Sequence, residues 1–218
     1  MRTKLTRPLA PIVFLAILAF APVARCAAAA PGLPPATALQ QLLDGNARYT
    51  TDKAARPGSR PSAAAQHPAA VILSCADSRV PPEILFDQGV GALFVVRDAG
   101  NTFDRLALES IEYAVAHLGT RLIVVLGHDQ CGAVKAAVDQ YPKPTDSVML
   151  KNIYPAVGKT HGKPGDPVSN AVSENAILTA ARLAHEPAFA ARVADGDLKI
   201  VPARYNLATG AVTLLPPE

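Results

Sequence analysis

The 218-residue sequence contains no Trp, and Phe, Trp and Tyr together make up only 5% of it. Its core must therefore be packed mainly by Ala, Val, Ile and Leu. No internal repeat is visible. The apolar run near the N-terminus, from about Ile12 to Ala21, is well short of the roughly 20 residues that a membrane-spanning helix needs. Basic residues do not cluster beyond the N-terminal segment, so the chain lacks the signature of a nucleic-acid-binding surface.

The first 30 residues have the order of a secretory signal peptide. Three basic residues precede the apolar run, and small residues crowd positions 27–30. We expect cleavage close to Ala30 and export, with the periplasm as the destination; a retained N-terminal anchor is the alternative. Cys26 would leave with the leader. Four of the 21 Lys and Arg residues also lie there, which leaves 17 against 18 Asp and Glu, so the basic balance belongs to the leader.

Residues 31–218 are predicted to form a single α/β domain. Short apolar runs typical of buried parallel strands occur at 71–74, 92–97, 121–126 and 199–205. Helical spacing occurs at 38–49, where Gly45 suggests an interruption, and at 104–118, 131–140 and 173–185, while 50–68 is expected to be mostly loop. The alternation predicts a mainly parallel central sheet of four strands with helices on both faces. Residues 211–215 are expected to return as an antiparallel edge strand, and Pro202 suggests an edge position or a bulge for 199–205.

Chemistry-bearing residues follow two of these strands. Cys75 comes directly after strand 71–74, and His128 and Cys131 come after strand 121–126. Because ligands in open α/β sheets sit outside the carboxyl ends of the strands, the two segments are expected to meet. Two thiolates and an imidazole suit zinc, and three protein ligands leave a fourth position for water, as in catalytic sites. The sequence therefore predicts a hydrolytic or hydrating enzyme with one zinc ion per chain.

Two alternatives stay open at this level. In an oxidising compartment, Cys75 and Cys131 could instead form a disulfide in a redox-active or non-enzymatic protein. Asp77 has three possible roles: it could close the site as a fourth zinc ligand, cap a helix, or be held aside by a bidentate ion pair with Arg79. In the last case Asp77 would orient the zinc-bound water.

Several segments, taken together, resemble the β-class carbonic anhydrases. They are Cys75-Ala-Asp77-Ser-Arg79-Val-Pro-Pro-Glu83, Phe94-Val-Val-Arg97-Asp-Ala-Gly100-Asn101, Ile111-Glu-Tyr113-Ala-Val and Gly127-His128-Asp-Gln-Cys131-Gly-Ala-Val. The resemblance extends from about Leu39 to Leu215. It implies zinc-dependent reversible hydration of carbon dioxide to bicarbonate and a proton, by attack of zinc-bound hydroxide. A relative that acts on another small linear electrophile, such as a carbon–sulfur compound, is the nearest alternative.

The same resemblance implies roles for individual residues. It implies zinc binding by Cys75, His128 and Cys131, a catalytic dyad of Asp77 and Arg79, and a carbon dioxide pocket formed by Gln66, Phe94 and Tyr113. The pocket would be drawn from two subunits of a homodimer, alone or within a dimer of dimers. Without the resemblance, Phe94 and Tyr113 would be interpreted as core residues. Possible proton relays are His67, His117, His161 and His185, which the sequence does not rank.

Three positions depart from the family pattern. Asp98 stands where Asn is usual, and Asn206 stands where Asp is common. Ile72 occupies the position, three residues before the first zinc Cys, at which a bicarbonate-regulated subset of the family has Trp. We therefore expect this form of bicarbonate gating to be absent.

Overall fold

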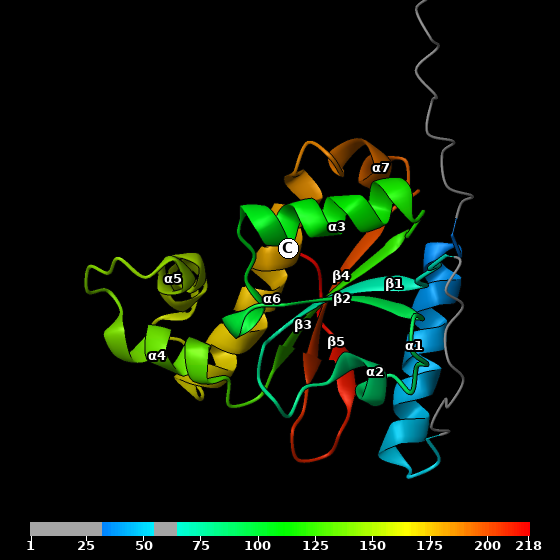
Figure 1. Ribbon diagram of the computed structural model, residues 1–218. Helices are drawn as coiled ribbons and strands as arrows, with labels where there is room; N and C mark the ends of the chain where they lie inside the picture. Colours follow the sequence, from blue (N-terminus) through cyan, green and yellow to red (C-terminus); the bar gives the residue numbers. More distant parts are fainter. Residues whose placement is uncertain (1–31, 55–64) are drawn as a thin grey trace, which may run out of the picture.

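The computed structural model describes residues 32–54 and 65–218. The predicted leader and part of the predicted 50–68 loop lie outside the described residues. A five-stranded sheet with the order β2-β1-β3-β4-β5 forms the centre of the molecule (Figure 1). Its strands are β1 (Ala70–Ser74), β2 (Leu93–Arg97), β3 (Leu122–His128), β4 (Lys199–Tyr205) and β5 (Val212–Leu214). The first four are parallel and β5 is antiparallel to β4, which confirms the predicted fold class.

Helices cover both faces of this sheet, as Figure 1 shows. On one face α1 (Pro35–Thr50) and α2 (Pro82–Leu85) pack against side chains such as Ile72 and Val124. On the other, α3 (Arg105–His117) and α6 (Pro167–His185) pack against Leu73 and Val125, and α7 (Ala190–Ala194) follows α6. Side chains of one strand point alternately to the two faces, and every residue of β1 and β3 is buried because both faces are covered.

The remaining helices surround the carboxyl ends of the strands. The short η1 (Ala99–Asn101) follows β2, and α4 (Gly132–Gln140) follows β3. Next comes α5 (Val148–Thr160), which packs against α4 and α6 and contains Pro155. The sequence did not predict α5, because proline inside a helix removes a backbone donor and is normally disfavoured. Here the helix is held by packing of Leu150, Ile153 and Val157 in a third apolar cluster.

Two local predictions were wrong. Pro202 lies in an interior strand, in continuous register with Val125 of β3. Its carbonyl accepts a hydrogen bond from the Leu215 amide, so its nitrogen, which has no proton to donate, also faces the β5 side of the strand. Leu215 lies just beyond the last residue of β5. Gly45 does not interrupt α1. A Cβ there would lie 1.8 Å from the Phe86 carbonyl oxygen, so the glycine permits close approach of the segment after α2.

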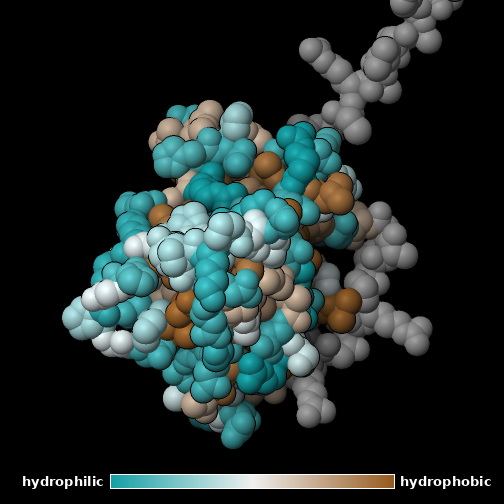
Figure 2. Space-filling view, turned by 90° about the vertical axis from the view of Figure 1, so that its left-hand side faces the viewer, coloured by the Kyte–Doolittle hydropathy of each residue, from teal (hydrophilic) through white to brown (hydrophobic). Residues whose placement is uncertain are grey.

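None of the described helices is long and apolar enough to cross a membrane. On the side of α4 and α5, hydrophilic residues dominate and hydrophobic ones form small separate patches (Figure 2). Larger exposed apolar side chains include Ile84, Val90, Leu106 and Tyr113.

Candidate active site

The structure brings the two predicted cysteines and the histidine together at the carboxyl ends of β1 and β3. Cys75 directly follows β1, His128 ends β3 and Cys131 is the N-cap of α4. The Cys75 and Cys131 sulfurs are 3.9 Å apart, and one ligand atom from each of the three residues lies within 4.8 Å of the others. All three side chains are buried. The prediction that the two segments meet is confirmed.

The ring of His128 has a defined orientation. Its Nδ1 lies 2.8 Å from the carbonyl oxygen of Asp129, an acceptor, so Nδ1 carries the proton and donates it. The lone pair of Nε2 then points into the site. Nε2 is buried and has no hydrogen-bond partner among the described residues. Since an unsatisfied buried polar atom costs free energy, this nitrogen is placed for a ligand rather than for the fold.

The sulfurs of Cys75 and Cys131 are hydrogen-bonded to one another. A hydrogen bond from Cys131 lowers the pKa of Cys75 to about 4, and the same interaction, with burial, raises the pKa of Cys131. The Gly100 amide also donates to the Cys75 sulfur, at 3.3 Å. A metal ion would replace the proton of this hydrogen bond, because cysteines bind metals as thiolates.

The donor set and its spacing fit zinc. Zn–S bonds of about 2.3 Å at a tetrahedral angle place two sulfurs about 3.8 Å apart, close to the 3.9 Å between Cys75 and Cys131. Sulfur and imidazole nitrogen are also the ligands that zinc prefers. Both cysteines are free, and their separation suits two ligands of one ion better than a disulfide, whose sulfurs are about 2.05 Å apart.

Asp77 is held by Arg79, as one of the three alternatives anticipated. The Arg79 amide and Nε donate to Oδ1 at 2.9 and 3.0 Å, and Nη2 donates to Oδ2 at 2.8 Å. These bonds hold the pKa of the Asp77 carboxyl well below its usual range. Oδ2 is 3.9 Å from Nε2 of His128, so the carboxylate borders the site. Asp77 does not cap α2, whose N-cap is Pro81.

Two further side chains support the ligands. Arg97, at the end of β2, donates through Nε to the Cys75 carbonyl at 3.0 Å and through Nη2 to the Asp77 carbonyl at 2.5 Å. Asn175 of α6, which is buried, donates to the Gly100 carbonyl at 2.7 Å and so holds the peptide whose amide faces Cys75. Asn175 was not identified from sequence, because nothing in a helical pattern distinguishes it.

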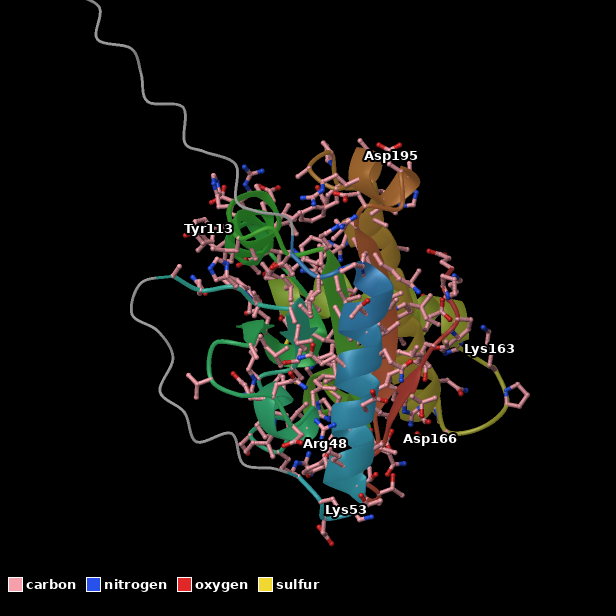
Figure 3. The ribbon with its side chains drawn as sticks, turned by 90° about the vertical axis from the view of Figure 1, so that its right-hand side faces the viewer. Arg48, Lys53, Tyr113, Lys163, Asp166 and Asp195 are labelled. Atoms are coloured by element: carbon pink, nitrogen blue, oxygen red, sulfur yellow. The ribbon has the colours of Figure 1, made fainter. Side chains whose placement is uncertain are left out.

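The predicted pocket residues lie elsewhere within one chain. The rings of Phe94 and Tyr113 are 6.4 Å apart, Tyr113 is 48% exposed and Gln66 is exposed. Figure 3 places Tyr113 on α3, at the opposite end of the molecule from Asp166, which caps α6. Gln66 precedes β1, whose five residues span about 15 Å before Cys75. A single chain therefore does not bring Gln66 to the cysteines.

The remaining sequence candidates are peripheral. The four possible proton relays, His67, His117, His161 and His185, are all exposed. His117 packs on Tyr113 and His161 on Tyr141, with ring centroids 5.2 and 5.8 Å apart. Asn206 accepts hydrogen bonds from the Ala208 and Thr209 amides, so it shapes the turn between β4 and β5.

Two thiols and an imidazole gathered at the carboxyl ends of parallel strands, beside an Asp–Arg pair, define an α/β protein with a candidate metal site where such sheets bind ligands. The carbonic anhydrase family model matches residues 70–212. Over 84% of its length, the chain is 42% identical to the carbonic anhydrase of Mycolicibacterium smegmatis and 39% identical to carbonic anhydrase 2 of Mycobacterium tuberculosis, covering 95% and 94% of those proteins. Among solved structures, Coccomyxa β-carbonic anhydrase in complex with acetazolamide aligns with a TM-score of 0.64 and 28% identity, over 83% of this chain and 82% of that one. The chain belongs to the β-carbonic anhydrase family, and it is an enzyme.

Proposed function

We propose that the protein catalyses the reversible hydration of carbon dioxide to bicarbonate and a proton, with one zinc ion per chain bound by Cys75, His128 and Cys131. The observation that carries this proposal is the buried Nε2 of His128, which has no hydrogen-bond partner in residues 32–54 and 65–218 and lies near two sulfurs at a zinc-compatible spacing. Membership of the carbonic anhydrase family supports the choice of substrate.

When bound, zinc supplies the Lewis acidity that brings the pKa of water near neutrality, a property already established with carbonic anhydrase itself. The side chains of this protein supply the orientation. Asp77 is kept ionised by Arg79. Its carboxylate can therefore accept a hydrogen bond from the attacking water and direct the oxygen lone pair toward carbon dioxide. Because Arg79 engages both carboxylate oxygens of Asp77, this side chain would orient the water and would not serve as a zinc ligand.

The proton released in each catalytic cycle must leave through the Asp77 side chain or directly to solvent. The Asp77 side chain is 17% exposed, so water reaches its carboxylate.

Arg97 binds the carbonyls of Cys75 and Asp77, which keeps the proposed zinc ligand and the residue that accepts the water's hydrogen bond on one rigid loop. Such preorganisation lowers the cost of orienting the reacting groups.

Stopped-flow hydration of carbon dioxide, with zinc content measured on the same sample, tests the proposal. The wild-type protein should hydrate carbon dioxide with about one zinc per chain, as a three-ligand site requires. His128→Gln should lose both, while His185→Gln, in which an exposed histidine is replaced, should retain both. Zinc without hydration, but with hydrolysis of a small carbon–sulfur electrophile, would favour the alternative substrate. Neither zinc nor hydration in the wild-type protein would refute the proposal.

We also propose that a second copy of the chain completes the carbon dioxide pocket. The half-buried Phe94 and the exposed Gln66 and Tyr113 would then face the partner's metal site. Sedimentation of wild-type protein and of Tyr113→Arg tests this, because a charge at such an interface should produce monomers. A monomeric wild-type protein would contradict it.

The N-terminal pattern supports a further proposal, export to the periplasm after cleavage near Ala30. Cell fractionation with N-terminal sequencing of the product tests it. Recovery of the full-length chain from the cytoplasm would contradict it.

A further inference from the structure

Strand β4 extends its pairing onto the loop that carries two of the proposed metal ligands. The register places Gly127 opposite Arg204 and His128 opposite Tyr205. Beyond the end of β3, the Asp129 amide still donates to the Tyr205 carbonyl, at 3.0 Å. The backbone that follows His128 is therefore attached to β4 rather than free in a loop.

The guanidinium of Arg204 adds a second attachment. Its Nε and Nη2 both lie 2.5 Å from Oδ1 of Asp129. Its Nη1 donates to the Ser169 carbonyl at 3.1 Å and to the Ser173 hydroxyl at 2.9 Å, and Nη2 donates to the Ser169 hydroxyl at 2.9 Å. Arginine has five N–H donors in a rigid fork. Here the fork joins Asp129 to the first turns of α6.

Asp129 is the residue whose carbonyl accepts the Nδ1 proton of His128, at 2.8 Å. Its amide is tied to Tyr205 and its carboxylate to Arg204, so the direction of that carbonyl is determined from both sides. The next residue, Gln130, has a φ of 53°, in the left-handed region that non-glycine residues adopt only under constraint. Cys131 follows it directly. The bonds that hold Asp129 therefore affect the positions of two proposed metal ligands, His128 and Cys131.

Fold stability is a weak explanation for this arrangement. The Arg204 and Asp129 side chains are 25% and 19% exposed and border an open cavity of about 380 Å³. Ion pairs that water reaches contribute little to stability. The Arg204 guanidinium binds one carboxylate, that of Asp129, and one helix, α6. Its main effect is therefore to fix the orientation of Asp129.

We propose that Arg204 is a positioning residue for the metal: through Asp129 it fixes the ring of His128 and the turn that leads to Cys131. This inference rests on the proposed zinc function. Partners that orient a metal-ligating histidine typically change metal affinity by about 10–100-fold when they are removed.

Arg121 offers a matched control. It directly precedes β3, seven residues before His128 and at the opposite end of the strand. Its side chain is 23% exposed, pairs with the Asp197 carboxylate, and donates through Nε to the Asp197 carbonyl at 3.0 Å. It thus resembles Arg204 in exposure and in pairing with an Asp, but among the described residues its hydrogen bonds and ion pair go to Asp197 and not to the metal site.

The test compares wild-type protein with Arg204→Met, Arg204→Lys and Arg121→Met, in the full chain. Three quantities are measured: zinc affinity by competition with a chromogenic chelator, the absorption spectrum of the Co²⁺-loaded protein, and urea unfolding of the metal-free protein. Arg204→Met should weaken zinc binding about 10-fold or more and change the Co²⁺ spectrum. Arg204→Lys keeps the charge without the fork and should give an intermediate affinity. Arg121→Met should keep the wild-type affinity and spectrum.

Wild-type affinity in Arg204→Met, or equal weakening in Arg121→Met, would overturn the inference. If Arg204→Met does not fold, Asp129→Asn decides, since it keeps the backbone carbonyl but weakens the hold of Arg204; unchanged affinity in that variant would overturn the inference too. Absence of zinc binding by the wild-type protein would instead refute the proposed function, and this inference with it, so the two failures are distinguishable.

Discussion

Replacement of Gly100 by alanine should damage both the fold and the metal site. Gly100 has a φ of 75° and lies in η1, where its backbone links a proposed metal ligand to a buried asparagine of α6. Its amide donates to the Cys75 sulfur at 3.3 Å, and its carbonyl accepts from Asn175 at 2.7 Å. An added Cβ would lie 2.7 Å from Cδ1 of Ile153 and 3.3 Å from the Ala133 Cβ, which is closer than ordinary contact.

The magnitude follows from two terms. A left-handed backbone costs an alanine about 1–2 kcal/mol relative to glycine. Ile153 is fully buried, so moving it away from the new methyl group costs about 1–3 kcal/mol, as overpacking in cores generally does. The sum is about 2–5 kcal/mol, which corresponds to a fall in melting temperature of about 4–20 °C for a chain of this size.

Gly132→Ala is the control for this prediction. Gly132 directly follows Cys131, but a Cβ there would meet no atom of the described residues within 4 Å, and its φ is not in the left-handed region. Alanine should be neutral or stabilising by about 0.5 kcal/mol. Urea unfolding of both metal-free variants at one protein concentration measures the two free energies, and chelator competition measures zinc affinity. Equal stability of the two variants would refute the reasoning, and wild-type zinc affinity in Gly100→Ala would refute the link from Gly100 to Cys75.

Three further predictions concern separate features. Arg79→Leu should lower hydration about 100-fold or more while zinc remains bound, because Asp77 loses its side-chain partners; loss of zinc in parallel would contradict the assigned role. Gly45→Ala should cost at least about 3 kcal/mol in urea unfolding, since its Cβ would lie 1.8 Å from the Phe86 carbonyl oxygen; wild-type stability would show that α1 can move. Added bicarbonate at constant pH should produce no cooperative loss of hydration, because a buried Ile72 stands at the Trp position; a sigmoidal loss in stopped-flow assays would contradict this.

Much of the sheet was predictable because its signal is local. Runs of four to seven mostly apolar residues marked all four parallel strands, and the runs of β1 and β3 are fully buried because both faces of the sheet are covered there. Local rules failed where a neighbour distant in sequence changed their meaning. Pro202, which has no backbone N–H, suggested an edge strand or a bulge. Strand β5 ends opposite Ala203, however, so the missing N–H of Pro202 lies outside the pairing of β4 with β5. Gly45 suggested a break, yet the space it leaves is filled by the Phe86 carbonyl.

The candidate site divides in the same way. Residue type and spacing alone determined that two thiols and an imidazole follow two strands, and that Asp77 and Arg79 stand beside them. Parallel strands have their carboxyl ends on one side of the sheet, so the meeting of these groups also followed from the pattern.

Only the tertiary structure decided how each group is held. It showed Asp77 bonded to Arg79, the proton of His128 directed at the Asp129 carbonyl, and Asn175 and Arg204 behind the ligands. Asn175 bonds Gly100, and Arg204 bonds Asp129, across 75 residues in each case. The sequence alone left these partners open because a hydrogen bond depends on distance and direction between two atoms. Across such separations, only the packing of α6 and β4 on the sheet determines both.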